Sequence, residues 1–183
     1  SSVIESPGNV CVKHIQRGYP LKEVYPEMKD HADKLRNIFE STCKSPEVDD
    51  IRSEIYIKSI NSFAFNTVAL DREFNNLQLS QDEYSKDCIR KIMTEGDQIL
   101  KILGLPIVQS IEDRISQTLS STKHTLSMLN DYRNGHQIEL GYLWEGFNSF
   151  CKILKIDMEF SKYMYEKVMD KVCTRQFSAV SNK

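Results

Sequence analysis

Residues 54–70 of this 183-residue chain read Glu-Ile-Tyr-Ile-Lys-Ser-Ile-Asn-Ser-Phe-Ala-Phe-Asn-Thr-Val-Ala-Leu. Apolar side chains fall on nearly every side of a helix drawn through this stretch, and such helices usually lie inside a protein. Lys58 sits near its centre, and Ser62 and Asn66 follow four and eight residues later on the same face. A lysine in these surroundings must be paired, solvated in a cleft or shifted toward neutrality. The stretch therefore predicts a buried helix whose polar stripe is a candidate site for an anionic or carbonyl ligand.

The composition is that of an ordinary globular protein. Apolar residues make up 40% of the chain, charged residues 27%, and the net charge is −2 at pH 7, so neither an anionic partner nor an anionic surface is favoured. No apolar run approaches the roughly 18 residues of a membrane span, and no signal peptide is visible. We therefore predict a cytoplasmic protein with no nucleic-acid partner and no membrane partner.

Cysteine and histidine usage argues against disulfides and metal sites. The number of cysteines is odd and none belongs to a C-x-x-C pair, so we predict free thiols in a reducing compartment. The histidines show no metal-ligand spacing with the cysteines, so we predict no metal. The residues concerned are Cys11, Cys43, Cys88, Cys151, Cys173, His14, His31, His124 and His136.

The first 45 residues predict a small β-β-α piece. Asn9–Ile15 is rich in residues that favour strands, Arg17-Gly18 is a turn signal, and residues 19–25 are expected to return as an edge strand. Residues 27–44 then switch to a helical period. The apolar stripe of that helix consists of Met28, Ala32, Leu35, Ile38 and Phe39.

The rest of the chain predicts helices, so the fold class is mainly α. After the buried helix, residues 69–79 show no clear period and are expected to form a loop. Further helices are expected over residues 81–103, 110–129, 138–154 and 160–177, with a break at residues 130–135 and a stop at Gly104 and Pro106.

Two motifs stand in order along the chain. The first is Glu54-Ile-Tyr-Ile-Lys58 followed by Asn66, and the second runs from Ser127-Met-Leu-Asn-Asp131 to Glu139. Together they resemble the C-terminal part of the ketopantoate reductase (2-dehydropantoate 2-reductase) family, and the resemblance covers nearly the whole chain. It implies an all-helical domain of the 6-phosphogluconate-dehydrogenase C-terminal-like type.

The resemblance also implies a division of the chain. Residues 1–46 would be the end of a nucleotide-binding Rossmann domain, a β-hairpin plus a helix, and residues 47–178 a helical substrate-binding and dimerisation domain, with a tail at 179–183. The sequence holds neither G-x-G-x-x-G nor G-x-x-x-x-G-K-[ST]. NADPH would therefore be bound mainly by a domain not present in this chain, and the chain alone is expected to be inactive. A homodimer is expected from family habit.

The chemistry implied is NADPH-dependent reduction of a 2-oxo acid, in the first place ketopantoate to pantoate in pantothenate and coenzyme A biosynthesis. Lys58 matches the family's catalytic lysine, which fits the negative charge that forms on a ketone oxygen during reduction. Glu139 matches a glutamate that contacts the substrate hydroxyl, and it could also hold the lysine. The candidate substrate-binding residues are Ser62, Asn66, Asn76 and Ser127.

Three positions depart from the family pattern. Ser62 and His124 stand where asparagine is common, and Asp157 stands near the place of a Thr-Pro pair. The first two would touch the substrate, so the resemblance does not fix pantoate as the product.

Structural readings remain open beside the catalytic ones. Lys58 can be a lysine whose head simply reaches water, Glu139 a helix-start charge, and Ser127 a hydroxyl bonded to its own backbone. The alternative function is a non-catalytic helical dimerisation or interaction module that retains the fold.

Overall fold

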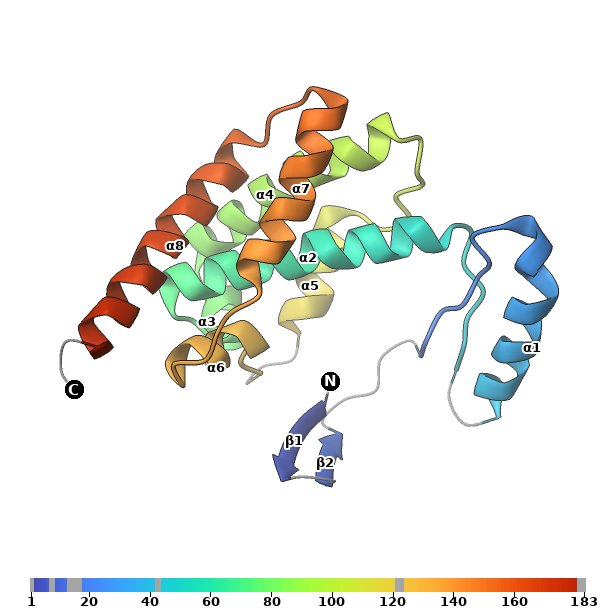
Figure 1. The fold of residues 1–183 in the computed structure, drawn as a ribbon, viewed down its shortest axis with the longest axis horizontal. Helices are drawn as coiled ribbons and strands as arrows, with labels where there is room; N and C mark the ends of the chain where they lie inside the picture. Colours follow the sequence, from blue (N-terminus) through green and yellow to red (C-terminus); the bar gives the residue numbers. More distant parts are fainter. Residues whose placement is uncertain (1, 7–8, 13–17, 42–43, 121–123, 181–183) are drawn as a thin grey trace. The chain divides into compact units, whose positions relative to one another are not determined.

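The computed structural model describes residues 2–6, 9–12, 18–41, 44–120 and 124–180, and divides into two compact units, Ser1–Glu54 and Ile55–Lys183 (Figure 1). The first unit holds β1 (Ser2–Ser6), β2 (Asn9–Val12), the 3-10 helix η1 (Pro26–Met28) and α1 (Lys29–Glu40). Helix α2 (Ile51–Arg72) starts in this unit and continues into the second. The second also contains α3 (Asn76–Gln81), α4 (Glu83–Ile102), α5 (Ile111–Leu119), α6 (Ser127–Arg133), α7 (Leu140–Leu154) and α8 (Glu159–Val180).

The two strands form an antiparallel hairpin in which Val3 lies opposite Cys11. A strand beginning at Asn9 is thereby confirmed, but its partner precedes it in the chain, and the last part of the expected strand and Arg17 lie outside the described residues. The Pro7-Gly8 dipeptide between the two strands favours turns and is the sequence signal for this pairing.

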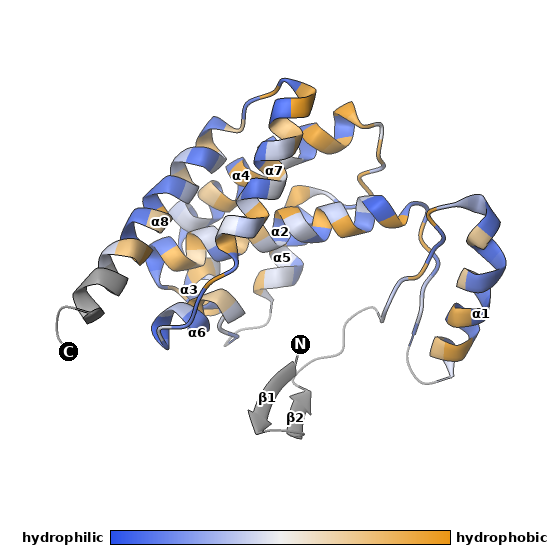
Figure 2. Ribbon diagram, viewed as in Figure 1, coloured by the Kyte–Doolittle hydropathy of each residue, from blue (hydrophilic) through white to orange (hydrophobic). Residues whose placement is uncertain are grey.

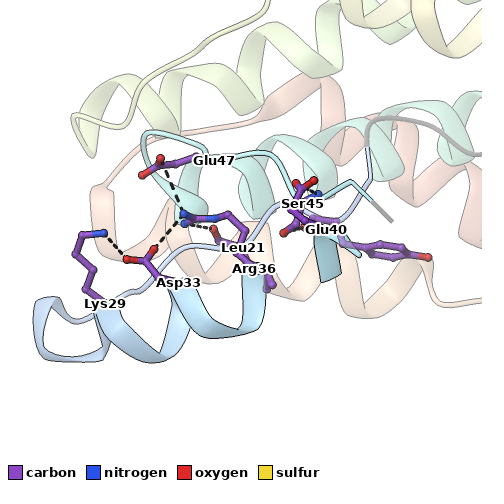
Figure 3. A network of polar contacts seen from close by, with 8 residues as sticks. Leu21, Lys29, Asp33, Arg36, Glu40, Ser45 and Glu47 are labelled. Atoms are coloured by element: carbon purple, nitrogen blue, oxygen red, sulfur yellow. Dashed lines mark hydrogen bonds and ion pairs between the residues drawn. The ribbon is translucent and has the colours of Figure 1, made fainter. Parts of the chain in front are cut away.

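The expected return strand at residues 19–25 is wrong. Its backbone groups bond to other parts of the unit instead, as the Tyr19 amide donates to the Lys44 carbonyl over 2.8 Å. The Arg36 guanidinium donates to the Leu21 carbonyl over 3.1 Å (Figure 3). Backbone groups that are hydrogen-bonded in this way do not require partners on a neighbouring strand.

Helix α1 has the amphipathic period expected, yet none of its residues is buried. Arg36, on its polar side, also binds Asp33 over 3.0 Å, and Asp33 pairs with Lys29 over 2.7 Å (Figure 3). Leu35 and Ile38 of the apolar stripe are exposed, and orange segments mark this stripe in Figure 2. Leu35 and Ile38 are therefore left exposed in the described part of the chain, whereas the Phe39 ring lies beside the Tyr19 ring, with centroids 6.3 Å apart.

Helix α2 is the buried helix expected from residues 54–70, and the helical second unit is confirmed. Its side chains at Ile60, Phe63, Phe65 and Val68 point in different directions around the axis and are all at most 2% exposed. Helix α7 crosses it (Figure 1), and the rings of Phe63 and Trp144 stack with centroids 5.9 Å apart. Among the described residues, no helix is both long and apolar enough to cross a membrane.

The loop expected at residues 69–79 is wrong, because α2 runs on to Arg72 and α3 begins soon afterwards. Glu73, in a left-handed conformation (φ 54°), ends α2. Asn75 and Gln78 form a reciprocal capping box that starts α3. The sequence Asn-x-x-Gln was therefore the missed signal.

The single helix expected over residues 110–129 is also wrong. Helix α5 ends at Leu119 and a separate helix, α6, occupies the predicted break as far as Arg133. The Ser120 hydroxyl donates to the Gln117 carbonyl over 2.7 Å. Serine and threonine side chains that bond local backbone groups in this way compete with the helix, and the sequence from 120 to 125 is rich in them.

The start of α8 is capped by a side chain from α4. The Glu95 carboxylate accepts hydrogen bonds from the backbone amides of Phe160 (2.9 Å) and Ser161 (2.8 Å) and from the Ser161 hydroxyl (2.6 Å). We expect Glu95→Ala to lower the free energy of unfolding by about 2 kcal/mol, because two helix-start amides lose a charged acceptor. Urea titration followed by circular dichroism measures this. Glu95→Gln should lose less, and equal stability of Glu95→Ala and wild type would contradict the assignment.

Candidate functional site

Lys58, Ser62 and Asn66 lie on one side of α2, and this side passes from solvent into the protein. Lys58 is exposed, Ser62 is half-buried and Asn66 keeps only 5% of its surface accessible. Lys58 has no ion pair or hydrogen bond with any residue that the structure describes. The stripe therefore offers a free ammonium group at its open end and an amide at its buried end.

The Asn66 side chain is oriented by its own helix. Its amide nitrogen donates to the Ser62 carbonyl over 2.8 Å and lies 3.4 Å from the Ser62 hydroxyl. Only the nitrogen can face a carbonyl, so the assignment of nitrogen and oxygen is chemically fixed. The Asn66 Oδ1 atom is buried and has no hydrogen-bond donor among the described residues. A buried acceptor of this kind is costly unless a ligand or water supplies a donor.

Asn76 repeats this arrangement at the start of α3. Its side-chain nitrogen donates to the Thr118 carbonyl over 3.0 Å, and its backbone amide donates to the His124 carbonyl over 3.0 Å. The residue is 1% exposed, and its Oδ1 atom also lacks a donor within the described part of the chain. Asn76 therefore ties α3 to the segment before α6 and leaves a second buried acceptor.

Ser127 and Glu139 mark the starts of two helices. Ser127 is the first residue of α6, Glu139 directly precedes α7, and both are exposed. The Glu139 side chain does not cap α7. In the described regions, Glu139 makes no ion pair with Lys58. The structure thus brings Ser62 to Asn66 but does not bring Glu139 to Lys58.

Ring contacts show how α7 crosses α2. Phe150, late in α7, packs edge-on against Tyr56 with centroids 5.2 Å apart, whereas the earlier Trp144 stacks on Phe63. Where the helices cross, the late part of α7 therefore lies toward the N-terminal end of α2, and the start of α7 lies toward its C-terminal half (Figure 1). Lys58 lies near the other end of α2. Glu139, which directly precedes α7, and Lys58 can therefore act together only if a ligand lies between them.

Tyr56, the aromatic residue two positions before Lys58, belongs to the α7 contact and not to the polar stripe. Burial raises the pKa of its phenol, and the nearby Cys151 adds to this effect. Its hydroxyl is buried without a partner among the described atoms. Tyr56 therefore acts as a neutral packing residue between α2 and α7.

The described histidines are not placed to form a metal site. His136 lies 3.5 Å from Asp131 on the surface, and the contact of His124 with Asn76 is made by its backbone carbonyl. In the part of the chain that the structure describes, no group of three or more His, Cys, Asp or Glu residues is placed to hold a metal ion.

Sequence reasoning missed a hollow of about 330 Å³ between α7 and α8. Its lining includes Ile138, Tyr142, Glu145 and Met169. Ile138, Tyr142 and Glu145 lie just before α7 or in its first turns, whereas Met169 lies in α8, at least 24 positions later. No local motif joins the two groups. The hollow contains none of the six predicted site residues.

Comparison with known proteins gives the family. Residues 50–172 match the family described as ketopantoate reductase PanE/ApbA C terminal. The chain belongs to this family. The match includes all six predicted site residues, and it confirms the resemblance drawn from the two motifs.

The individual relatives have low sequence identity to this chain. A 2-dehydropantoate 2-reductase of Mesorhizobium japonicum is 25% identical over 142 residues, which is 76% of this chain and 43% of that protein. The fold is shared with a 2-dehydropantoate 2-reductase from Geobacter metallireducens (TM-score 0.81, 18% identity, 93% of this chain and 58% of that one). It is also shared with D-mandelate dehydrogenase solved with NADH and anilino(oxo)acetate (TM-score 0.80, 18% identity, 95% and 58%).

A ketopantoate reductase from Staphylococcus aureus, described as dimeric, shares the fold at a TM-score of 0.62 and 12% identity over 78% of this chain and 51% of that one. The chain spans about half the length of the relatives that it matches.

Proposed function

We propose that this chain is the substrate-binding and catalytic part of an NADPH-dependent 2-oxo-acid reductase, with ketopantoate as the first candidate substrate. The observation that carries the proposal is the polar stripe of α2. It joins a free, exposed ammonium at Lys58 to a buried, unpaired acceptor at Asn66, inside the segment that matches the family.

Lys58 has the position and charge required of the acid. NADPH, when bound, would supply hydride to the carbonyl carbon of the substrate. The Lys58 ammonium would stabilise the negative charge that develops on the carbonyl oxygen and would donate the proton that completes the hydroxyl. Because it is not paired with a described carboxylate, its charge is available to the ligand.

The remaining residues would orient the substrate. The Oδ1 atoms of Asn66 and Asn76 can only accept, so they suit hydroxyl groups of the substrate. The hydroxyls of Ser62 and Ser127 can donate to its carboxylate. The exposed carboxylate of Glu139 would accept from the hydroxyl that forms. Such contacts supply orientation, which lowers the barrier as well as aiding affinity.

We propose that another domain of the protein holds most of the nucleotide. The seven glycines of the sequence never form a phosphate-binding pattern. We propose that residues 1–46 complete a Rossmann domain in a longer protein and that residues 47–178 form the substrate domain. The exposed Leu35 and Ile38 side chains of α1 support this, because the sheet of such a domain would cover them.

Self-association is a further part of the proposal. The dimeric relative from Staphylococcus aureus supports it. We expect the full-length protein to have the mass of a homodimer at micromolar concentration in light scattering. A monomeric mass would contradict this expectation without affecting the proposed chemistry.

The test of the function is an assay of the full-length protein. Oxidation of NADPH and NADH is followed at saturating concentrations of ketopantoate, of another branched 2-oxo acid and of an aryl 2-oxo acid. Reduction of any of them supports the reductase proposal, and the ratio of their kcat/KM values identifies the substrate. No turnover with any pair would favour the interaction module.

A further inference from the structure

The rotation of α2 about its own axis is not fixed by its apolar residues. Phe63, Phe65, Val68 and Ala69 are all at most 2% exposed although they point in different directions. A helix that is apolar all round can exchange one buried residue for another when it turns, since cores tolerate such exchanges if volume is kept. Burial of these residues alone therefore does not select one rotation, and contacts with a fixed direction add to it.

A buried ion pair makes a directional contact with α2. Arg114 of α5 is 2% exposed and Asp97 of α4 is 5% exposed, and the Arg114 Nη2 atom pairs with Asp97 Oδ2. The other terminal nitrogen, Nη1, donates to the Asn61 Oδ1 atom of α2 over 3.4 Å. Arg114 therefore links three helices, and Asn61 is its contact on α2.

The same level of α2 is held closely by α4. A Cβ atom at Gly96 would lie 2.9 Å from two side-chain carbons of Ile60, so α4 approaches α2 more closely here than any other residue would allow. Gly96 precedes Asp97, and Ile60 precedes Asn61. The steric contact and the polar contact therefore act on adjacent residues, within one helical turn of Lys58.

The buried pair is a poor source of stability. Apolar residues of similar volume often replace such pairs without loss, and their attested use is to specify one arrangement among several. Here Arg114 Nε and Asp97 Oδ1 are buried without partners among the described residues, which makes the stabilising role weaker still. Specification of the helix rotation explains why a charge is buried at this place.

We propose that Arg114, neutralised by Asp97 and bonded to Asn61, is a positioning residue that fixes the rotation of α2 and thereby the place of Lys58. The inference rests on the proposed catalytic role of Lys58. A rotation of about 20° moves a group at the helix surface, 5–6 Å from the axis, by about 2 Å. A misplacement of about 1 Å can lower turnover about 100-fold.

Asn61→Leu in the full-length protein is the first test. It removes the acceptor on α2, keeps a similar volume and leaves the Arg114–Asp97 pair intact. We expect kcat to fall at least about 10-fold with a KM change of less than about threefold, because the ligand still binds but meets a misplaced ammonium. Asn61→Asp keeps the acceptor oxygen and should retain kcat within about threefold.

A double variant and a matched control complete the test. Arg114→Met/Asp97→Leu removes the pair without stranding a charge and should lower kcat as Asn61→Leu does. Arg90 and Glu112 join the same two helices, α4 and α5, through an exposed pair of 2.6 Å that does not involve α2. Arg90→Met/Glu112→Leu should leave kcat unchanged.

The outcomes separate this inference from the proposed function. Wild-type kcat in folded Asn61→Leu would overturn the inference, as would an equal loss in the Arg90/Glu112 control. If the wild type reduces no 2-oxo acid, the proposed function fails. The inference about α2 is then tested by comparing crystal structures of the wild type and Asn61→Leu. A rotated α2 in Asn61→Leu would support it, and an α2 that superposes on the wild type would overturn it.

Discussion

Lys58→Ala is expected to lower kcat of the full-length protein by about 10²–10⁴-fold, the range found when a positioned acid is removed. KM for the 2-oxo acid should rise much less, because the proposed contacts of Ser62, Asn66 and Ser127 with the substrate would remain. The fold should be unaffected, since Lys58 is exposed and makes no described hydrogen bond or ion pair. Stability should therefore stay within about 0.5 kcal/mol of the wild type.

The control for this variant is Lys101→Ala. Lys101 is also an exposed lysine in a helix of the second unit, in the last turn of α4. Steady-state NADPH oxidation should be the same for Lys101→Ala and the wild type. Retained kcat in Lys58→Ala would show that Lys58 is only a surface lysine whose head reaches water.

Arg114→Met is expected to lower the free energy of unfolding by about 3–5 kcal/mol. The physical reason is the buried Asp97 carboxylate, which loses its counter-charge and cannot reach water at 5% exposure. Arg114→Met/Asp97→Leu should recover most of this loss, because no charge is then left buried. Urea titrations of the wild type, the single variant and the double variant measure both effects.

The exposed pair formed by Arg90 and Glu112 provides the comparison for stability as well. It joins the same helices, but its side chains are 39% and 64% exposed. Arg90→Met should therefore cost no more than about 1 kcal/mol. An Arg114→Met variant as stable as Arg90→Met would mean that Asp97 is solvated and not buried.

The central helix was predictable because its signal is local. A run of apolar residues around Lys58 specifies a buried helix, and the spacing of Ser62 and Asn66 places them on one face whatever surrounds them. The family motifs are also local, which is why the helical domain was assigned correctly from them.

The errors arose where short-range backbone chemistry decides the structure. The capping box at Asn75 starts α3 inside a stretch without period, and Glu73 ends α2 without a glycine. The sequence analysis placed the partner of β2 at residues 19–25, whereas β2 pairs with β1, which precedes it. Pro7-Gly8, between the two strands in the sequence, favours a turn there. Each of these depends on two or three residues, so hydrophobic periodicity does not detect them.

Contacts between helices could not be predicted from this single sequence. Arg114 lies 17 residues from Asp97 and 53 from Asn61, and either charge alone is ordinary on a helix surface. The unpaired oxygens of Asn66 and Asn76 likewise appear only when burial and hydrogen bonds are known. The motifs named the candidate residues, whereas the structure shows which of their atoms are free to bind.

The most direct test is a crystal structure of the full-length protein with a 2-oxo acid and the oxidised nucleotide NADP⁺, a pair that cannot react. We expect the carbonyl oxygen to lie within hydrogen-bond distance of Lys58 Nζ, with the ligand lying along the α2 stripe toward Asn66. A 2-oxo acid bound elsewhere, with Lys58 facing solvent, would contradict it.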